Sequence, residues 1–239
     1  TLRRSSAASD VYKRQVMLGA IVEYHPHDFP DGVKSNGAIA FLDRDGVLNI
    51  GRAGYVNNTE QMVKLENAGK VVGDLRRLGF RVCVVTNQSA LMRGLWNTET
   101  LVEIHNHLRL QLLAEDDDAH LDVIITCPHR NIDRCNCRKP MPGMLQIGDA
   151  IFRKKLPVNI GLNSEVDVSG DYPKVNWWKN KPKPSDDNDL IVGDRKSDLG
   201  AGWAMGLRLF KVPEQVGIDY VSDRVINFDD RGDSFQPVR

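Results

Sequence analysis

Short apolar runs alternate with helix-type stretches from residue 38 to residue 212. The runs predict buried strands at 38–42, 81–85, 121–126, 190–192 and 208–212. Apolar residues recur at helical spacing in 68–78, 101–112, 145–156 and 199–205. Asn97 or Thr98 can cap the second of these helices, and Gly79 can end the first. Such alternation is typical of βαβ units, so we expect an α/β fold with a Rossmann-like, three-layer parallel sheet.

The segments outside this pattern set the expected domain organisation. Residues 1–15 resemble translated adapter sequence or a disordered tail more than a transit-type presequence, and Met17 can be a natural start. We interpret 1–37 as a surface arm, partly disordered or artefactual, 38–212 as one domain, and 213–239 as a peripheral tail. Within the domain, 163–188 is an insert whose adjacent Trp177 and Trp178 either pin it to the body or stack a base or a sugar.

Composition narrows the class of partner. Lysine plus arginine equals aspartate plus glutamate at 32 each, so no bulk basicity indicates nucleic acid or a membrane surface. No apolar run approaches the roughly 18 residues that span a bilayer. Clustered cysteines favour a metal site in a reducing compartment over disulfides. We therefore expect a cytoplasmic monomer.

Polar clusters at 43–46, 86–89 and 193–198 follow three of the predicted strands. In an open parallel sheet such strand ends share one crevice. Asp43 and Asp45 alternate with Arg44, so both carboxylates can face the crevice while Arg44 points elsewhere, and Gly46 permits a sharp exit. One carboxylate can act as a nucleophile and the other as a general acid and base. Their mutual repulsion predicts a divalent cation beside them.

Other groups at these strand ends suit phosphate chemistry. The Thr86 hydroxyl and the backbone N–H groups after it can hold a phosphoryl oxygen, and Lys139 can neutralise both a phosphate and Asp43. Asp194 is a natural Mg²⁺ carboxylate. Asp198 has two open interpretations, since it can hold Lys139 or a metal-bound water, or it can simply cap the next helix.

Four metal-type ligands lie within eleven residues, namely Cys127, His129, Cys135 and Cys137. Three thiolates and one imidazole match a closed, tetrahedral zinc site with no open position for water. The sequence therefore predicts a small structural zinc loop over 127–137. Cys83 lies inside an apolar strand and is expected in the core.

Together these motifs resemble the haloacid dehalogenase superfamily of phosphatases. The stretches Asp43–Asn49, Val85–Ser89, Arg138–Pro140 and Val192–Asp198 resemble its four motifs in order. The zinc loop resembles the branch that contains heptose-bisphosphate and histidinol-phosphate phosphatases. Gly54–Val56, Met92–Gly94 and Pro142–Leu145 favour the heptose group, and the resemblance covers 37–212 apart from the insert.

The resemblance implies roles for individual residues. Asp43 would be the nucleophile and Asp45 the general acid and base, while Thr86 and Lys139 would steady the phosphoryl group. Mg²⁺ would be held by Asp43, the main-chain carbonyl of Asp45, and Asp194. We expect the substrate to contact Tyr55, Asn87, Gln88, Ser89, Arg138 and Arg195. The inter-motif segments imply no separate cap domain, with the zinc loop in place of the lid.

These expectations describe a Mg²⁺-dependent hydrolase of a small sugar phosphate that works through an aspartyl-phosphate. The chain departs from the family pattern at Ala90–Met92, at Arg195 and in the insert, which leaves the substrate open. A histidinol-phosphate phosphatase is the first alternative. A polynucleotide 3′-phosphatase is the second, because the tryptophan–lysine insert could stack bases. The third is a non-enzymatic, zinc-stabilised binding module.

Overall fold

A computed structural model describes residues 19–153, the backbone of 164–167, and residues 175–236. The strands are β1 (Gly19–Tyr24), β2 (Ile39–Leu42), β3 (Arg81–Asn87), β4 (Val123–Cys127), β5 (Ser164–Asp167), β6 (Leu190–Gly193) and β7 (Arg208–Lys211). The helices are α2 (Ala68–Arg77), α3 (Thr98–Leu113), α4 (Gly143–Phe152), α5 (Lys196–Ala204) and α6 (Ser222–Val225). Short 3₁₀ helices cover Thr59–Gln61, Asn131–Asp133 and Gly217–Val221.

One mixed sheet organises the fold, in the order β5-β1-β4-β3-β2-β6-β7. The strands from β4 to β7 in this order are parallel to one another, as predicted. β1 runs antiparallel to both β4 and β5, so the expectation of a purely parallel sheet is wrong at this side. The parallel part still aligns the carboxyl ends of β2, β3 and β6 at one edge.

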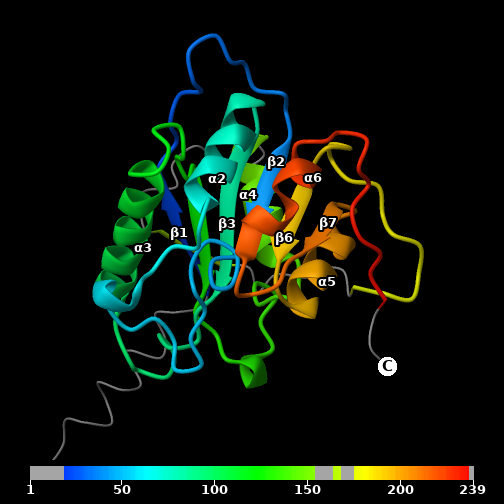
Figure 1. Ribbon diagram of the computed structural model, residues 1–239. Helices are drawn as coiled ribbons and strands as arrows, with labels where there is room; N and C mark the ends of the chain where they lie inside the picture. The colour runs from blue at the N-terminus through cyan, green and yellow to red at the C-terminus, as the bar shows by residue number, and fades with distance from the viewer. Residues whose placement is uncertain (1–18, 154–163, 168–174, 237–239) are drawn as a thin grey trace, which may run out of the picture.

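Side-chain alternation along β2 separates the core into two layers. Ala40 and Leu42 pack on one face against α2, α3 and the segment after β7. Ile39 and Phe41 pack on the other face against α4 and α5. Helices therefore cover both faces of the sheet, which confirms the three-layer α/β architecture (Figure 1). In the described part of the chain no segment between these elements forms a separate cap domain, and no helix is long and apolar enough to cross a membrane.

Two residues that the sequence suggests as helix boundaries, Asn97 and Gly79, lie at helix ends in the structure. The side chain of Asn97 accepts a hydrogen bond from the N–H of Thr100 and begins α3. Gly79 follows α2 with φ of 85°, the left-handed conformation that ends a helix without strain when no Cβ is present. α4 ends at Phe152, and residues 154–156 of the predicted helix lie outside the described residues.

The N-terminal segment contains a strand that the periodicity does not predict. The interpretation of 16–37 as a surface arm is wrong for Gly19–Tyr24, because β1 lies inside the sheet between β4 and β5. Five of its six residues are buried, including Glu23. A strand that is covered on both faces shows no alternation of polar and apolar positions, which hides it from sequence analysis.

The segment after β7 is also more than a peripheral tail. Ile218, Val221 and Val225 are completely or almost completely buried in the core. The guanidinium of Arg208 donates hydrogen bonds to the carbonyls of Asn227 (2.8 Å) and Asp230 (3.1 Å), which fastens the segment to β7. Polar spacing around these apolar residues makes the segment look like a surface tail.

The same segment contacts the loop that follows β2. The N–H of Ile218 donates to the carbonyl of Val47 at 3.0 Å. Gly217, with φ of 71°, approaches so closely that a Cβ at this position would lie 2.5 Å from the Val47 carbonyl oxygen. The end of the described chain thus supports the loop that leaves Asp43 and Asp45.

Part of the insert is attached to α5. The indole N–H of Trp177 donates to the carbonyl of Gly200 at 3.2 Å, and Trp177 packs against the core layer of α4 and α5. Trp178 is 63% exposed. These contacts favour the pinning interpretation for Trp177, whereas residues 163 and 168–174 of the predicted insert lie outside the described residues.

The buried position of Ile218 predicts a large effect of truncation. We expect Ile218→Ala to lower the free energy of unfolding by about 2–5 kcal/mol, because it removes a core side chain and leaves a cavity. Val216→Ala is the matched control, since Val216 is 41% exposed in the same segment and should cost less than about 1 kcal/mol. Urea denaturation measures both, and equal small effects would contradict a structural role for the segment.

Candidate active site at the carboxyl ends of the parallel strands

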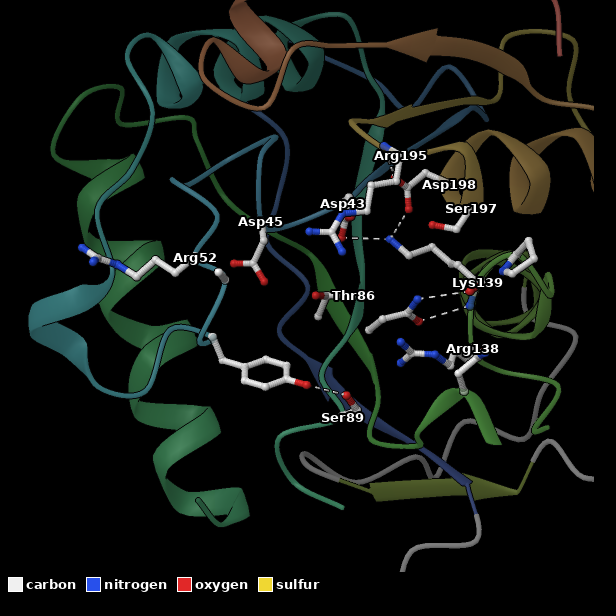
Figure 2. Close-up of a pocket in the computed structure, with 15 residues that line it drawn as sticks. Asp43, Asp45, Arg52, Thr86, Ser89, Arg138, Lys139, Arg195, Ser197 and Asp198 are labelled. Carbon is white, nitrogen blue, oxygen red and sulfur yellow. Dashed lines mark hydrogen bonds and ion pairs between the residues drawn. The ribbon is translucent and has the colours of Figure 1, made fainter. Parts of the chain in front are cut away.

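A cavity of about 430 Å³ opens where β2, β3 and β6 end. Its lining brings together most of the residues that the sequence singles out (Figure 2). The lining residues are Asp43, Asp45, Arg52, Ala53, Tyr55, Thr86, Asn87, Ser89, Asn131, Arg138, Lys139, Pro140, Arg195, Ser197 and Asp198. The predicted convergence of three strand ends on one crevice is therefore observed.

Lys139 occupies the centre of this site. Its ammonium lies 2.8 Å from Oδ1 of Asp43 and 2.7 Å from Oδ1 of Asp198, as Figure 2 shows. The third contact of Nζ is the carbonyl of Val85 in β3, at 2.7 Å. The ammonium is thus paired with two carboxylates and donates a hydrogen bond to the main chain of β3. Lys139 thereby joins β2, β3 and α5 at the bottom of the cavity.

Burial and neighbouring charges shift the pKa of the central groups. Burial raises the pKa of Asp43 to about 7, with Asp198 adding repulsion and Lys139 opposing the rise. Burial alone would lower the pKa of Lys139, but the carboxylates of Asp198 and Asp43 outweigh it and raise that pKa. The two carboxylates therefore favour the charged form of the Lys139 ammonium, whereas burial disfavours the charged form of Asp43.

Asp43 also belongs to a cluster of three carboxylates. Carboxylate oxygens of Asp43, Asp194 and Asp198 lie within 4.8 Å of one another. Oδ1 of Asp194 is buried and has no hydrogen-bond partner among the residues that the structure describes. Three carboxylates face one ammonium, so the donor set and the excess negative charge fit a divalent cation. Gly46, with φ of 80°, allows the main chain after Asp45 to lie close to Asp194, because a Cβ at this position would be 2.9 Å from the Asp194 carboxyl.

Asp198 combines the two interpretations left open by the sequence. Oδ1 contacts Lys139, and Oδ2 accepts a hydrogen bond from the N–H of Arg195 at 2.9 Å, which caps the start of α5. The helix N-terminus and the ion pair thus fix the same carboxylate. Asp198 also belongs to the group of three neighbouring carboxylates. The Mg²⁺ ligands expected from the resemblance did not include its carboxylate.

The side chain of Asp45 faces the cavity but is held by other groups. Nη2 of Arg44 lies 3.0 Å from Oδ1 and 2.9 Å from Oδ2, while Asn49 donates to Oδ1 (2.9 Å) and Gln88 to Oδ2 (2.8 Å). Arg44 does not line the cavity, as expected, but its long side chain bends back to hold the carboxylate of Asp45 from the buried side. Burial favours a higher pKa for Asp45, but Arg44, Asn49 and Gln88 outweigh it and lower the pKa.

The polar residues at the carboxyl end of β3 and just after it fall into two groups. Thr86, Asn87 and Ser89 line the cavity, whereas Gln88 is 1% exposed and donates to Thr86 and Asp45. Gln88 is thus placed to orient other side chains, away from the cavity surface. The side chain of Asn87 accepts a hydrogen bond from the N–H of Lys139 (3.1 Å) and donates one to its carbonyl (3.2 Å). These two bonds connect the end of β3 to the loop that carries Lys139.

Cationic side chains surround the mouth of the cavity. Arg138 donates to the carbonyl of His129 at 2.9 Å, and Nε of Arg195 lies 3.4 Å from Asp194. Arg52 also lines the cavity, although no motif in the sequence points to it. Asn131 and Ser197 are likewise not predicted, because each lies in a loop or helix start next to a recognised motif. Tyr55 lines the cavity too and shares a 2.9 Å hydrogen bond with Ser89.

The predicted metal cluster is assembled beside this cavity. Sγ atoms of Cys127, Cys135 and Cys137 lie 3.2–3.5 Å apart, and Nδ1 of His129 lies 3.2 Å from Cys137 and 3.5 Å from Cys127. Ligands of a tetrahedral zinc ion lie roughly 3.5–3.8 Å apart, close to this spacing. Soft thiolates and an imidazole, largely buried, can therefore hold one ion. Cys83 is fully buried in β3, as expected for a core residue.

Known proteins resemble this chain in sequence and in fold. No protein-family model matches. The chain is 36% identical over 168 residues to the D-glycero-beta-D-manno-heptose-1,7-bisphosphate 7-phosphatase of Pseudomonas putida, covering 70% of this chain and 78% of that protein. It is 37% identical over 113 residues to the Pseudomonas aeruginosa protein of the same name, covering 47% of this chain and 62% of that protein. The latter match spans less than two thirds of the relative's length.

A solved structure gives a similar result. The D,D-heptose 1,7-bisphosphate phosphatase from B. bronchiseptica, crystallised with magnesium and phosphate, matches with a TM-score of 0.56 and 28% identity. The match covers 77% of this chain and 84% of that one. Sequence and structure comparisons thus agree on the fold and on the family. The chain belongs to the family of haloacid dehalogenase-like D-glycero-D-manno-heptose-1,7-bisphosphate 7-phosphatases.

Proposed function

We propose that this protein is a Mg²⁺-dependent phosphomonoester hydrolase that removes the 7-phosphate of D-glycero-D-manno-heptose 1,7-bisphosphate. The observation that carries the proposal is the buried Lys139 ammonium between Asp43 and Asp198, at the base of an open cavity. The names of the curated relatives supply the substrate. Both point to transfer of a phosphoryl group at the strand ends.

The proposed reaction starts with attack by the Asp43 carboxylate. A bond forms between its oxygen and phosphorus, the bond from phosphorus to the sugar oxygen breaks, and Asp45 gives that oxygen a proton. Asp45 then takes a proton from water as the water oxygen attacks phosphorus and frees Asp43. Lys139 and Thr86 hold the phosphoryl oxygens in both steps. Most of the catalytic effect in such reactions comes from positioning and charge stabilisation.

Mg²⁺ fits the acidic group beside the nucleophile. Asp43, Asp194 and the main-chain carbonyl of Asp45 would hold the ion, which would offset negative charge on the phosphoryl oxygens and on Asp43. The raised pKa of Asp43 supports this assignment, because the carboxyl needs additional positive charge to remain ionised at neutral pH.

The mouth of the cavity supports a substrate with a second anionic group. Arg52, Arg138 and Arg195 all line it, and guanidinium groups bind phosphate well. A bisphosphate would place one phosphate at Lys139 and leave the other for these arginines. Histidinol phosphate carries an ammonium in place of the second phosphate, which this arginine-rich mouth disfavours.

The first test is a phosphate-release assay with a panel of substrates. With Mg²⁺ present we expect the highest kcat/KM for heptose 1,7-bisphosphate, then for histidinol phosphate and a 3′-phosphorylated oligonucleotide, because the arginines of the cavity can bind the second phosphate of a small bisphosphate. The assay without Mg²⁺ is the control. A preference for histidinol phosphate or the oligonucleotide would change the substrate, and no hydrolysis of any of them would favour the binding-module alternative.

The second test replaces the two carboxylates. We expect Asp43→Asn and Asp45→Asn each to lower kcat by at least about 10²-fold, since each removes a group that acts on the reacting atoms. Asp223→Asn, an exposed acid on α6, should leave kcat unchanged and serves as the control. Steady-state kinetics decides the matter, and more than a tenth of wild-type activity in both variants would contradict the mechanism.

For the cysteine cluster we propose a structural zinc ion. Elemental analysis should find about one equivalent of zinc that survives weak chelation of Mg²⁺. Cys135→Ser should lose zinc, thermal stability and activity together, because Lys139 follows the ligand Cys137 by two residues. Cys83→Ala is the control, since it should lose stability but keep zinc. Zinc-free wild-type protein after refolding with zinc would refute the assignment.

A further inference from the structure

Arg44 is completely buried, although it lies between the two carboxylates of the active site. Nε and Nη2 of its guanidinium contact Asp45, at 3.1 Å and 3.0 Å from Oδ1. Nη1 points the other way and lies 3.2 Å from Nε2 of His105 on α3. Two nitrogens of the guanidinium therefore contact Asp45, and the third contacts His105, which lies far away in the sequence.

His105 continues the contact to the strand that sequence analysis missed. His105 is fully buried, and its Nδ1 contacts Oε1 of Glu23 in β1. Glu23 is 1% exposed, and its other oxygen accepts from Nη1 of Arg109 at 3.1 Å. The order of contacts is Glu23, His105, Arg44 and Asp45, so the active-site carboxylate is connected across the sheet to β1.

The hydrogen-bond directions in this chain of contacts are determined by its two ends. A carboxylate can only accept hydrogen bonds, so Nδ1 of His105 carries the proton and donates a hydrogen bond to Glu23. Nε2 then carries a lone pair, which accepts from Nη1 of Arg44. Burial lowers the pKa of His105 and outweighs the opposing effect of Glu23, which favours the neutral ring that this arrangement requires. Because Arg44 contacts Asp45 on one side and His105 on the other, its guanidinium cannot rotate without losing a contact.

The arrangement controls the orientation of Asp45. Both of its oxygens are held, by the fork of Arg44 on one side and by Asn49 and Gln88 on the other. The Asp45 side chain nevertheless stays 24% exposed and lines the cavity. Buried charges and polar groups cost stability when they could be replaced by apolar packing. A task in the active site accounts for keeping them.

We propose that Glu23 and His105 are positioning residues, which act through Arg44 to hold the carboxyl of Asp45 towards the leaving oxygen. The proposal rests on the proposed function, in which Asp45 transfers the proton. It predicts a loss confined to kcat, because the cationic mouth that binds substrate does not contact this chain of residues. Small misplacements of a reacting group can slow a reaction by about 10²-fold.

The kinetic test compares His105→Leu with His105→Gln. We expect His105→Leu to lower kcat by about tenfold or more with KM changed less than about twofold, because the support of Arg44 is lost. Glutamine has both a donor and an acceptor, so His105→Gln should recover most of kcat. Leu108→Ala, a core truncation on the same helix, should lower stability without lowering kcat. Equal kcat losses in all three variants would refute the proposal.

A second variant and a structural readout keep the test independent of folding and of substrate. Arg44→Lys retains the charge but loses the fork, so kcat should fall here as well. A crystal structure of His105→Leu, or of Arg44→Lys if the former does not fold, should show the Asp45 carboxyl turned from its original position. An unchanged Asp45 would refute the proposal even if wild type hydrolysed nothing, whereas an inactive wild type with a turned Asp45 would refute only the proposed function.

Discussion

The buried ammonium of Lys139 is the interaction on which the site depends. A charge taken out of water must be paired and fully hydrogen-bonded to be tolerated. Here the pairing groups come from the end of β2, the end of β3 and the first turn of α5. None of these elements can shift without taking a contact away from the ammonium. The same contacts leave an excess of carboxylates on one side, which is the condition for binding a divalent cation.

Two supports outside the strand ends fix the reacting groups. The cysteine and histidine cluster lies immediately before Lys139, and its residue His129 accepts from Arg138. On the opposite side, Arg44 connects Asp45 with His105 and Glu23. The proposed proton donor and the lysine that contacts the proposed nucleophile are thus held by different parts of the molecule. A loop too short to have a core can position a lysine in this way only if something else, such as a metal ion, makes it rigid.

The sequence was sufficient for the parallel strands and the strand-end clusters, because apolar runs followed by polar residues have one arrangement in such a sheet. It was not sufficient for β1, which is buried at five of its six residues and pairs with a strand about a hundred positions later. The alternation of Asp43, Arg44 and Asp45 gave the directions of Cα–Cβ bonds, not the end of a long side chain. In the last segment the spacing of Ile218, Val221 and Val225 was a helical signal, obscured by charged neighbours.

The hydrogen bond from Ile218 to Val47 has a consequence for the smallest chain that can work. The sheet is finished at β7, and all proposed reacting groups precede it. A polypeptide ending there would nevertheless lack the support beneath the turn that carries the first motif. Deletion mapping from the carboxyl end should therefore locate the functional boundary beyond α6, later than a diagram of the strands suggests.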